Sequence, residues 1–235
     1  MTRRRWIADR VEGDRAYLLD QNANHLFRVL RVKPVQEFEV VAEGVVRLGT
    51  VVFASEHRVE FHLGEEFVSP ALPEISVYLS IFKFDRLEWA LEKLTELGVA
   101  RVTPVIAART GRHLIKAAAT RVSRWRKIVH EAAQQSRRAA PPAIAQPALL
   151  KEAVTAVAGS RIVLSETEAS TSLKKELARS QPPLSLAFGP EGGWTAEEVQ
   201  MFQESEWKPA SLGSTILRAE TAAIAAVAVA FAELG

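Results

Sequence analysis

The sequence predicts an α/β protein in two parts: a small β-barrel and a larger domain built on a mostly parallel sheet. Up to about Val68, short β-like segments follow one another closely with turn residues between them, which is typical of a small barrel. The segment Ser69–Pro73 contains two prolines, which favour extended chain and indicate a linker. Strand-like and helix-like segments then alternate, as in a parallel sheet covered by helices. We expect domains over residues 1–69 and 74–235.

Four segments are expected to form strands of the barrel. They are residues 16–19, 38–41, 45–53 and 58–63. The last of them alternates polar and apolar side chains, as a strand with one buried face does.

Five apolar runs are expected to form the sheet of the second domain. They are residues 75–81, 102–107, 161–164, 184–188 and 210–212. Pro104 has no amide hydrogen to donate, so the run that contains it is expected to be an edge strand or to end early.

Residues that start and stop helices lie between these runs. Asp85 and Glu88 form a capping-box pair before a leucine-rich apolar face, and Gly98 suits the end of that helix. Thr195 and Glu198 form a second capping box. Two further helices are expected over residues 117–135 and 220–234, and the second of these is apolar over most of its circumference.

The composition restricts the classes of function. Cysteine is absent, which excludes disulfides and thiolate metal sites and favours a reducing compartment. The five histidines show no metal-ligand spacing, so no metal is expected. The N-terminus lacks the apolar region of a signal peptide, and the longest apolar run, residues 221–234, is shorter than a bilayer span. We expect a cytoplasmic protein that does not enter a membrane.

Positive charge is unevenly distributed along the chain. The net charge is only +2, but Lys and Arg residues gather in several clusters. The clusters are Arg3–Arg5, Lys83 with Arg86, Arg121–Lys127, and Arg137 with Arg138. A single cluster is usually a solvated face, whereas several across two domains favour a polyanionic partner such as RNA.

Two glycine-bearing stretches, residues 188–194 and 211–221, each follow a strand-like run and lead into a helix-like segment. Glycine at such a turn lets the backbone approach a ligand and present its N–H and C=O groups. Two such turns in one half of the chain predict a pocket built mostly from main chain, suited to an adenosine-containing cofactor. The dinucleotide and P-loop fingerprints are absent from the sequence.

These stretches, G-P-E-G-G and then S-L-G-x-x-I-L-R-x-E-T-A, resemble the C-terminal signature of the SPOUT methyltransferase superfamily. Other segments are similar to its ribosomal RNA small subunit methyltransferase E family, which methylates N3 of a uridine in 16S ribosomal RNA. They are residues 25–31, 83–89, 95–99, 124–128 and 134–136. The sequence departs from the family at Arg137, where glycine is common. The resemblance implies a deep trefoil knot in the second domain and a PUA-like, RNA-binding first domain.

The resemblance also implies S-adenosylmethionine as the cofactor, held between three loops of the second domain. The residues expected to hold it are Leu164, Glu166, Phe188, Gly189, Pro190, Glu191, Gly192, Gly193, Leu212, Gly213, Ile216, Leu217 and Arg218. Backbone groups of Gly213 and Leu217 can read the adenine edge, and the paired glycines leave room for the ligand.

Methylation of uridine N3 needs a group that removes the N3 proton or stabilises the resulting anion. We expect Arg218 to stabilise the anion or orient the base, with a phosphate contact as the alternative role. Glu191 and Glu220 are the candidate bases, although Glu220 equally suits the first turn of a helix.

The small ribosomal subunit and its 16S RNA are the expected partners. Candidate RNA contacts are Arg4, Arg5, His25, Arg31, Lys83, Arg86 and Arg109, each of which is otherwise a surface charge. A homodimer is expected as well, because a helix apolar all round needs a partner on both sides and SPOUT proteins pair through the knotted region. Another helix of the same chain is the alternative partner.

Two other functions remain open at this point. One is ribose 2′-O-methylation by another kind of SPOUT enzyme, which usually carries an asparagine–arginine motif where this chain has Thr95–Val99. The other is a non-catalytic RNA-binding protein of ribosome assembly. The intact glycines and Arg218 favour an enzyme.

Overall fold

A computed structural model describes residues 4–68, 71–155, 157–165 and 171–235. The chain divides into two compact units. The first comprises Met1–Ala71 with Ala133–Pro141, and the second comprises Leu72–Ala132 with Pro142–Gly235. The break after Ala71 lies within the segment expected as a linker, whereas the sequence did not predict that residues 133–141 belong with the first unit.

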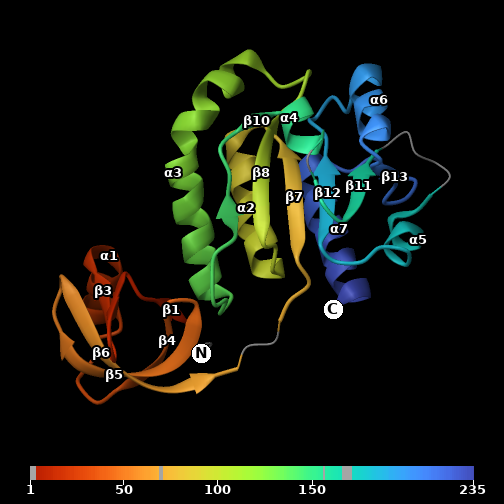
Figure 1. The fold of residues 1–235 in the computed structure, drawn as a ribbon. Helices are drawn as coiled ribbons and strands as arrows, with labels where there is room; N and C mark the ends of the chain where they lie inside the picture. Colours follow the sequence, from red (N-terminus) through yellow and green to blue (C-terminus); the bar gives the residue numbers. More distant parts are fainter. Residues whose placement is uncertain (1–3, 69–70, 156, 166–170) are drawn as a thin grey trace. The chain divides into compact units, whose positions relative to one another are not determined.

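The first unit is built on a curled six-stranded sheet with the order β1-β4-β5-β6-β3-β2 (Figure 1). Its strands are β1 (Trp6–Ile7), β2 (Arg10–Glu12), β3 (Arg15–Leu19), β4 (Glu37–Ala42), β5 (Val45–Ala54) and β6 (Arg58–Phe67). The four expected strands are present as β3 to β6. The two others are too short for an alternating pattern to reveal them.

A short helical segment connects β3 to β4. It consists of α1 (Asp20–Asn24) and the π-helix η1 (His25–Val29), neither of which was predicted. Ala23 and Leu26 from this segment are buried with Trp6, Leu18 and Phe61 in the core of the first unit. The segment therefore packs its apolar side chains against the sheet.

The second unit contains a seven-stranded parallel sheet, which confirms the predicted α/β class. The order is β10-β8-β7-β12-β11-β13, and β9 also pairs with β8. The strands are β7 (Ile75–Ser80), β8 (Arg101–Ile106), β9 (Ala143–Ile144), β10 (Ala148–Leu149), β11 (Ser160–Leu164), β12 (Leu184–Phe188) and β13 (Lys208–Ala210). The last was expected at residues 210–212, so that boundary was wrong.

The strand that contains Pro104 is not an edge strand. On one side β8 pairs with β7, and on the other it pairs with two short strands. β9 pairs with Arg101 and Val102, and β10 pairs with Val105 and Ile106, so neither short strand is in register with Pro104. The interruption between β9 and β10 accommodates a residue that has no amide hydrogen.

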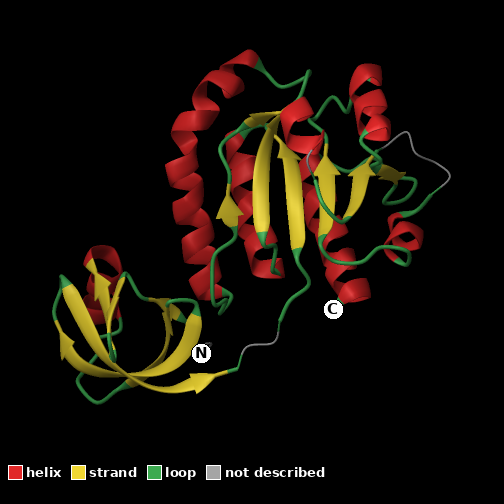
Figure 2. Cartoon of the chain, in the orientation of Figure 1, coloured by secondary structure: helices red, strands yellow, loops and turns green. Residues whose placement is uncertain are grey.

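Helices cover both faces of the parallel sheet (Figure 2). They are α2 (Phe84–Leu97), α3 (Arg112–Gln135), α4 (Leu150–Thr155), α5 (Leu173–Leu177), α6 (Ala196–Glu204) and α7 (Ala219–Leu234). α3 begins earlier than the expected Ala117, and the short helices α4 and α5 were not predicted. Within the described part of the chain, no helix combines the length and apolar character that a membrane span requires.

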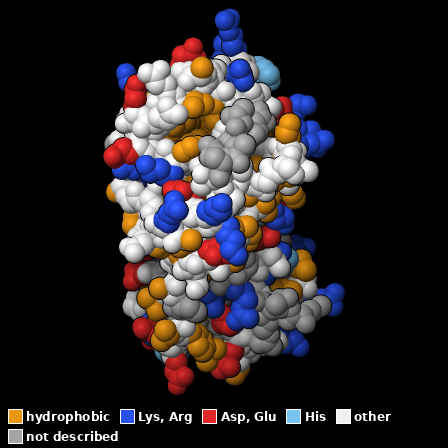
Figure 3. Space-filling model, turned by 90° about the vertical axis from the view of Figure 1, so that its right-hand side faces the viewer, with side chains coloured by type: hydrophobic (Ala, Val, Ile, Leu, Met, Phe, Trp, Pro, Cys, Tyr) orange, Lys and Arg blue, Asp and Glu red, His pale blue; other side chains and the backbone are white. Residues whose placement is uncertain are grey.

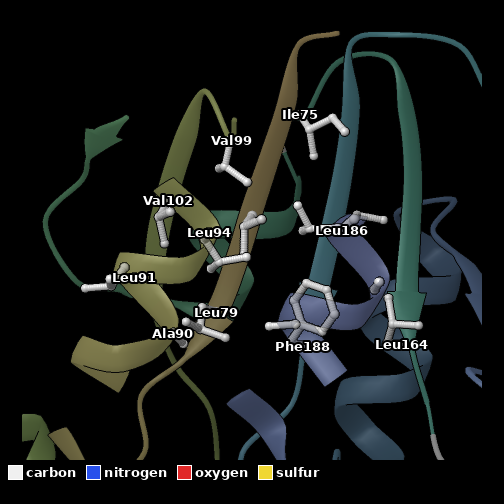
Figure 4. Close-up of a cluster of buried hydrophobic side chains, with 14 of the residues drawn as sticks. Ile75, Leu79, Ala90, Leu91, Leu94, Val99, Val102, Leu164, Leu186 and Phe188 are labelled. Atoms are coloured by element: carbon white, nitrogen blue, oxygen red, sulfur yellow. The ribbon is translucent and has the colours of Figure 1, made fainter. Parts of the chain in front are cut away.

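Alternate residues of each strand pack on opposite faces, as the two-residue period of a strand requires. Leu186 and Phe188 of β12 lie in the core formed with α2, α3, α5 and α7, whereas Ala187 lies in the core formed with α4 and α6. Figure 4 shows Leu91 and Leu94 of α2 beside the strands that carry Val102 and Leu79. Both faces of the sheet are therefore buried, as in other parallel sheets.

One predicted capping box is present and the other was wrong. The Thr195 hydroxyl accepts a hydrogen bond from the Glu198 amide, and the Glu198 carboxylate accepts one from the Thr195 amide. At α2 the N-cap is Lys83, with no side-chain cap, because Glu88 instead accepts hydrogen bonds from Arg121 and Arg124. The predicted C-cap of α2 is present, since Gly98 has a φ of 113°.

The α6 cap gives a direct test of this part of the fold. Replacing Thr195 with alanine removes the acceptor for a helix N–H, and such changes cost about 1 kcal/mol of unfolding free energy. Glu198→Ala is expected to cost more, because the buried Glu198 carboxylate also accepts a hydrogen bond of 2.7 Å from the Ala108 amide. Urea unfolding measures both effects, with exposed Gln203→Ala in α6 as the control. Equal costs for Thr195→Ala, Glu198→Ala and the control would contradict the capping role.

Candidate functional site

A cavity of about 380 Å³ lies where three neighbouring parallel strands end. Leu164 at the end of β11, Phe188 at the end of β12 and Ala210 at the end of β13 all line it. Ligands of open α/β sheets bind outside the carboxyl ends of the strands, and small-molecule sites have volumes of about 300–1,000 Å³. Position and size both indicate a ligand site.

The loop after β12 forms one wall of the cavity. The Gly193 amide donates a hydrogen bond of 2.8 Å to the Pro190 carbonyl oxygen, and Gly193 has a φ of 68°. A Cβ at Gly189 would lie 3.2 Å from the Trp194 ring. Gly192 does not line the cavity: a Cβ there would lie 3.2 Å from the Arg109 side chain, so this glycine makes room for Arg109.

The loop after β13 forms the opposite wall. Its first residue is fixed by backbone hydrogen bonds, since Ser211 accepts one from the Leu173 amide and donates one to the Thr171 carbonyl oxygen. Residues 213–218 are exposed. Gly213 has a φ of 128°, and a Cβ there would meet no atom within 4 Å. The open space at Gly213 and the exposed main chain around it leave room for a ligand.

Trp194, in the loop after β12, lines the cavity and contacts the end of β11. Its indole Nε1 donates a hydrogen bond of 3.1 Å to the Leu164 carbonyl oxygen. Its ring packs edge-on against Phe202, with ring centroids 4.8 Å apart. No role was predicted for Trp194, although it is the last residue of the first glycine-bearing stretch.

Among the residues that the structure describes, three charged ones line the cavity: Arg86, Glu191 and Arg218. Arg86 donates a hydrogen bond of 2.7 Å to Glu191, and its Nε lies 3.7 Å from a carboxylate oxygen of Glu220. Glu220 is buried and does not line the cavity. Arg218 is exposed at the N-cap of α7, and its guanidinium makes no ion pair within the described part of the chain.

Most residues expected to hold a cofactor therefore lie around one cavity. They are Leu164, Phe188, Gly189, Pro190, Glu191, Gly193, Leu212, Gly213, Ile216, Leu217 and Arg218. Gly192 lies outside the lining, and Glu166 lies outside the described residues. Sequence reasoning missed Trp194, Val199 and Ala222, which line the cavity from outside the expected cofactor loops.

In the first unit, two of the expected RNA-contact residues already bind other side chains of that unit. Arg4 donates a hydrogen bond of 2.9 Å to Gln135, and Arg5 forms an ion pair of 2.8 Å with Glu39. Burial, and then the charge of Arg4, lower the pKa of His25, so this imidazole is predominantly neutral at pH 7. Arg31 is exposed.

In the second unit, the expected RNA-contact residues have different surroundings. Lys83 is exposed at the N-cap of α2. The Arg109 guanidinium donates a hydrogen bond to the Gly192 carbonyl oxygen, and Arg86 is held by carboxylates. Lys83 is therefore the most available of the three for an external partner.

The structure accounts for the unusual residue at position 137. Arg137 has a φ of 60°, a conformation that glycine adopts readily, which agrees with the glycine expected there. The Arg137 guanidinium forms an ion pair with Glu39, and its carbonyl oxygen accepts a hydrogen bond from Arg5. These contacts all lie within the first unit.

No group of three or more His, Cys, Asp or Glu residues that could hold a metal ion occurs in the described ranges.

Comparison with known proteins identifies the family. Residues 70–231 match the family model described as an RNA methyltransferase domain. Ribosomal RNA small subunit methyltransferase E of Synechocystis is 36% identical over 159 residues, covering 66% of this chain and 52% of that protein. The enzyme of that name from Mycobacterium bovis is 31% identical over 226 residues, covering 92% of this chain and 83% of that protein.

Among solved structures, ribosomal RNA small subunit methyltransferase E from Neisseria gonorrhoeae, bound to S-adenosyl methionine, has the same fold. The TM-score is 0.86 at 29% identity, over 96% of this chain and 95% of that one. The family match, the relatives and the cavity between the two glycine loops agree with one another. The chain belongs to the ribosomal RNA small subunit methyltransferase E family.

Proposed function

We propose that this protein transfers a methyl group from S-adenosylmethionine to N3 of a uridine in 16S ribosomal RNA. The observation that carries the proposal is the cavity between two glycine loops at the ends of β11, β12 and β13, in a chain of this family. The Neisseria gonorrhoeae relative, with nearly full coverage of both chains, binds S-adenosyl methionine.

The residues around the cavity fit this cofactor. The adenosine would lie against main chain of the loop 211–218, where Gly213 leaves open space. Apolar side chains from both walls, Leu212 and Phe188 among them, would pack against its flat surfaces. When bound, the cofactor supplies an electrophilic methyl group on a positively charged sulfur.

The side chains that line the cavity are suited to removing the N3 proton of the uridine. N3–H of uridine is a weak acid, so an acceptor must take its proton as N3 attacks the methyl carbon. The bound cofactor would release its methyl group in the same step, and the electron pair of the carbon–sulfur bond would stay on its sulfur. We assign the proton acceptor to Glu191, which lines the cavity and is half-exposed, rather than to the buried Glu220. Arg218, at the mouth of the cavity without an ion pair among the described residues, would stabilise the negative charge of the base.

The uridine must be unpaired when it reacts, since N3 lies on its Watson–Crick edge. We propose that Arg31 and Lys83, both exposed, contact the RNA. Arg4 and Arg109 would have to break their hydrogen bonds to Gln135 and Gly192 before they could contact it. On the face that Figure 3 shows, Lys and Arg side chains lie among acidic and hydrophobic ones.

Two finer features of the fold belong to this proposal. The segment 211–218 and α7 would form the trefoil knot together with loops that precede them in the sequence. Ser211 forms backbone hydrogen bonds with Thr171 and Leu173. The curled sheet of the first unit would be a PUA-like, RNA-binding domain. The family resemblance supports both features.

A homodimer is also part of the proposal. One face of α7, with Ala223, Ala226, Val227 and Ala230, packs into the core of its own unit. Another stripe of α7 is small or apolar and at least partly exposed. It consists of Thr221, Ile224, Ala225, Ala228 and Ala232. The exposed Ile216, in the loop that precedes α7, would extend this surface.

The reaction is tested on small ribosomal subunits isolated from cells without this activity. Incubation with the protein and a deuterated methyl donor is expected to yield labelled 3-methyluridine in 16S RNA, detected by nucleoside mass spectrometry. Label in a 2′-O-methylated nucleoside would show ribose methylation, and no label, despite bound cofactor, would indicate a non-catalytic protein.

The cofactor site is tested by Gly213→Leu. A side chain there would occupy the space assigned to the cofactor, and the φ of 128° adds strain of about 1–3 kcal/mol. We expect S-adenosylmethionine affinity, measured calorimetrically, to fall at least about tenfold, which corresponds to 1.4 kcal/mol. Gly44→Leu is the control, because Gly44 also has a positive φ and open space around its Cβ but lies in the first unit. Unchanged affinity in Gly213→Leu would rule out this site.

The dimer is tested by sedimentation at micromolar concentration. We expect twice the chain mass for the parent protein and a shift towards monomer for Ala228→Glu, since a charge on the stripe would be buried in the interface. A parent protein that sediments as a fully active monomer would contradict the proposal.

A further inference from the structure

Arg86 links two carboxylates that come from different segments of the chain. Glu191 lies in the loop after β12, and Glu220 lies in the first turn of α7. One guanidinium nitrogen of Arg86 is 2.7 Å from Glu191, and its Nε is 3.7 Å from Glu220. The first distance is that of a strong hydrogen bond between charged groups, and the second is that of an ion pair.

Glu220 is an unusual residue to find buried. Its side chain is 6% exposed, and its second carboxylate oxygen has no hydrogen-bond partner among the described residues. Arg86 is the cation within ion-pair distance of it in the described part of the chain. A buried carboxylate needs a nearby positive charge, so Glu220 holds the Arg86 guanidinium in place.

Glu191 is much more exposed than Glu220. Its side chain is 46% exposed and belongs to a loop, where a carboxylate would otherwise sample many rotamers. The hydrogen bond from Arg86 restricts it to the wall of the cavity. The buried Glu220 thus fixes Arg86, and Arg86 fixes Glu191.

We infer that Arg86 is a positioning residue, anchored by Glu220, that orients Glu191 for proton removal from the substrate. This inference rests on the proposed function, because it assigns Glu191 to the reaction. It differs from the sequence-based expectation, in which Arg86 binds RNA and Glu220 is a candidate base.

A kinetic cycle distinguishes these roles. Arg86→Gln alone would leave the buried Glu220 charge without a partner and could unfold the protein. The double variant Arg86→Gln/Glu220→Gln removes the guanidinium and the buried charge together. It is compared with Glu191→Gln and with the triple variant, using methylation of small ribosomal subunits as the assay. Lys93→Gln, which breaks ion pairs elsewhere on α2, is the control.

If Arg86 acts through Glu191, the double variant should lose about 100-fold in kcat, as expected for a misplaced reacting group. The triple variant should then match Glu191→Gln within about twofold, since Arg86 has nothing left to position. The double and triple variants should keep a KM for the ribosomal subunit near that of the parent. Lys93→Gln should keep both kcat and KM near those of the parent.

Two results would overturn the inference while leaving the proposed function intact. One is a triple variant whose loss in kcat equals the product of the losses in the double variant and in Glu191→Gln. That result would mean that Arg86 acts independently of Glu191. The other is a double variant with a raised KM and an unchanged kcat, as expected for an RNA contact. A parent protein that makes no 3-methyluridine would instead refute the proposed function itself.

Discussion

The parallel pairing of β11 with β12 on one side and β13 on the other is the constraint on which the site depends. Its register aligns Val163 with Ala187 and Leu164 with Ala210. The loops that leave β12 and β13 therefore start at the same edge of the sheet, although they lie far apart in sequence. Burial of side chains such as Phe188 holds this arrangement, and each contributes about 1.5–3 kcal/mol.

In the proposed site, main chain would bind the cofactor and a few charged side chains would carry the chemistry. A main-chain wall needs little more than correct loop geometry, which Gly193, Gly213 and the hydrogen bonds of Ser211 supply. The charged groups need support of their own. Glu220 supports Arg86, and the α6 cap of Glu198 also holds the loop at Ala108. The buried Glu220 thus fixes a residue that lines the cavity, and the buried Glu198 fixes the loop at Ala108.

The sequence was most informative where local patterns are strong. The apolar runs of the inner strands, the Thr195–Glu198 capping box and the glycine loops were all predicted and are present. Short elements such as β1 and α5 were missed, because two to five residues carry no clear period.

Predictions about side-chain partners were less successful, because such partners depend on tertiary contacts. Glu88 suits a cap at Asp85 locally, but Arg121 and Arg124 of α3 bind it instead. Gly192 was expected to hold the cofactor, but it does not line the cavity, and a Cβ there would lie against the Arg109 side chain. The same limit applies to Arg86, whose link to Glu191 and Glu220 joins three segments and leaves no local pattern in the sequence.

Hydrogen–deuterium exchange with and without S-adenosylmethionine tests most directly whether these two loops form the cofactor site. Binding is expected to slow exchange of the amides in residues 189–194 and 211–218, while β4 and β5 of the first unit stay unchanged. Protection confined to other segments, with both loops exchanging as in the free protein, would contradict the account.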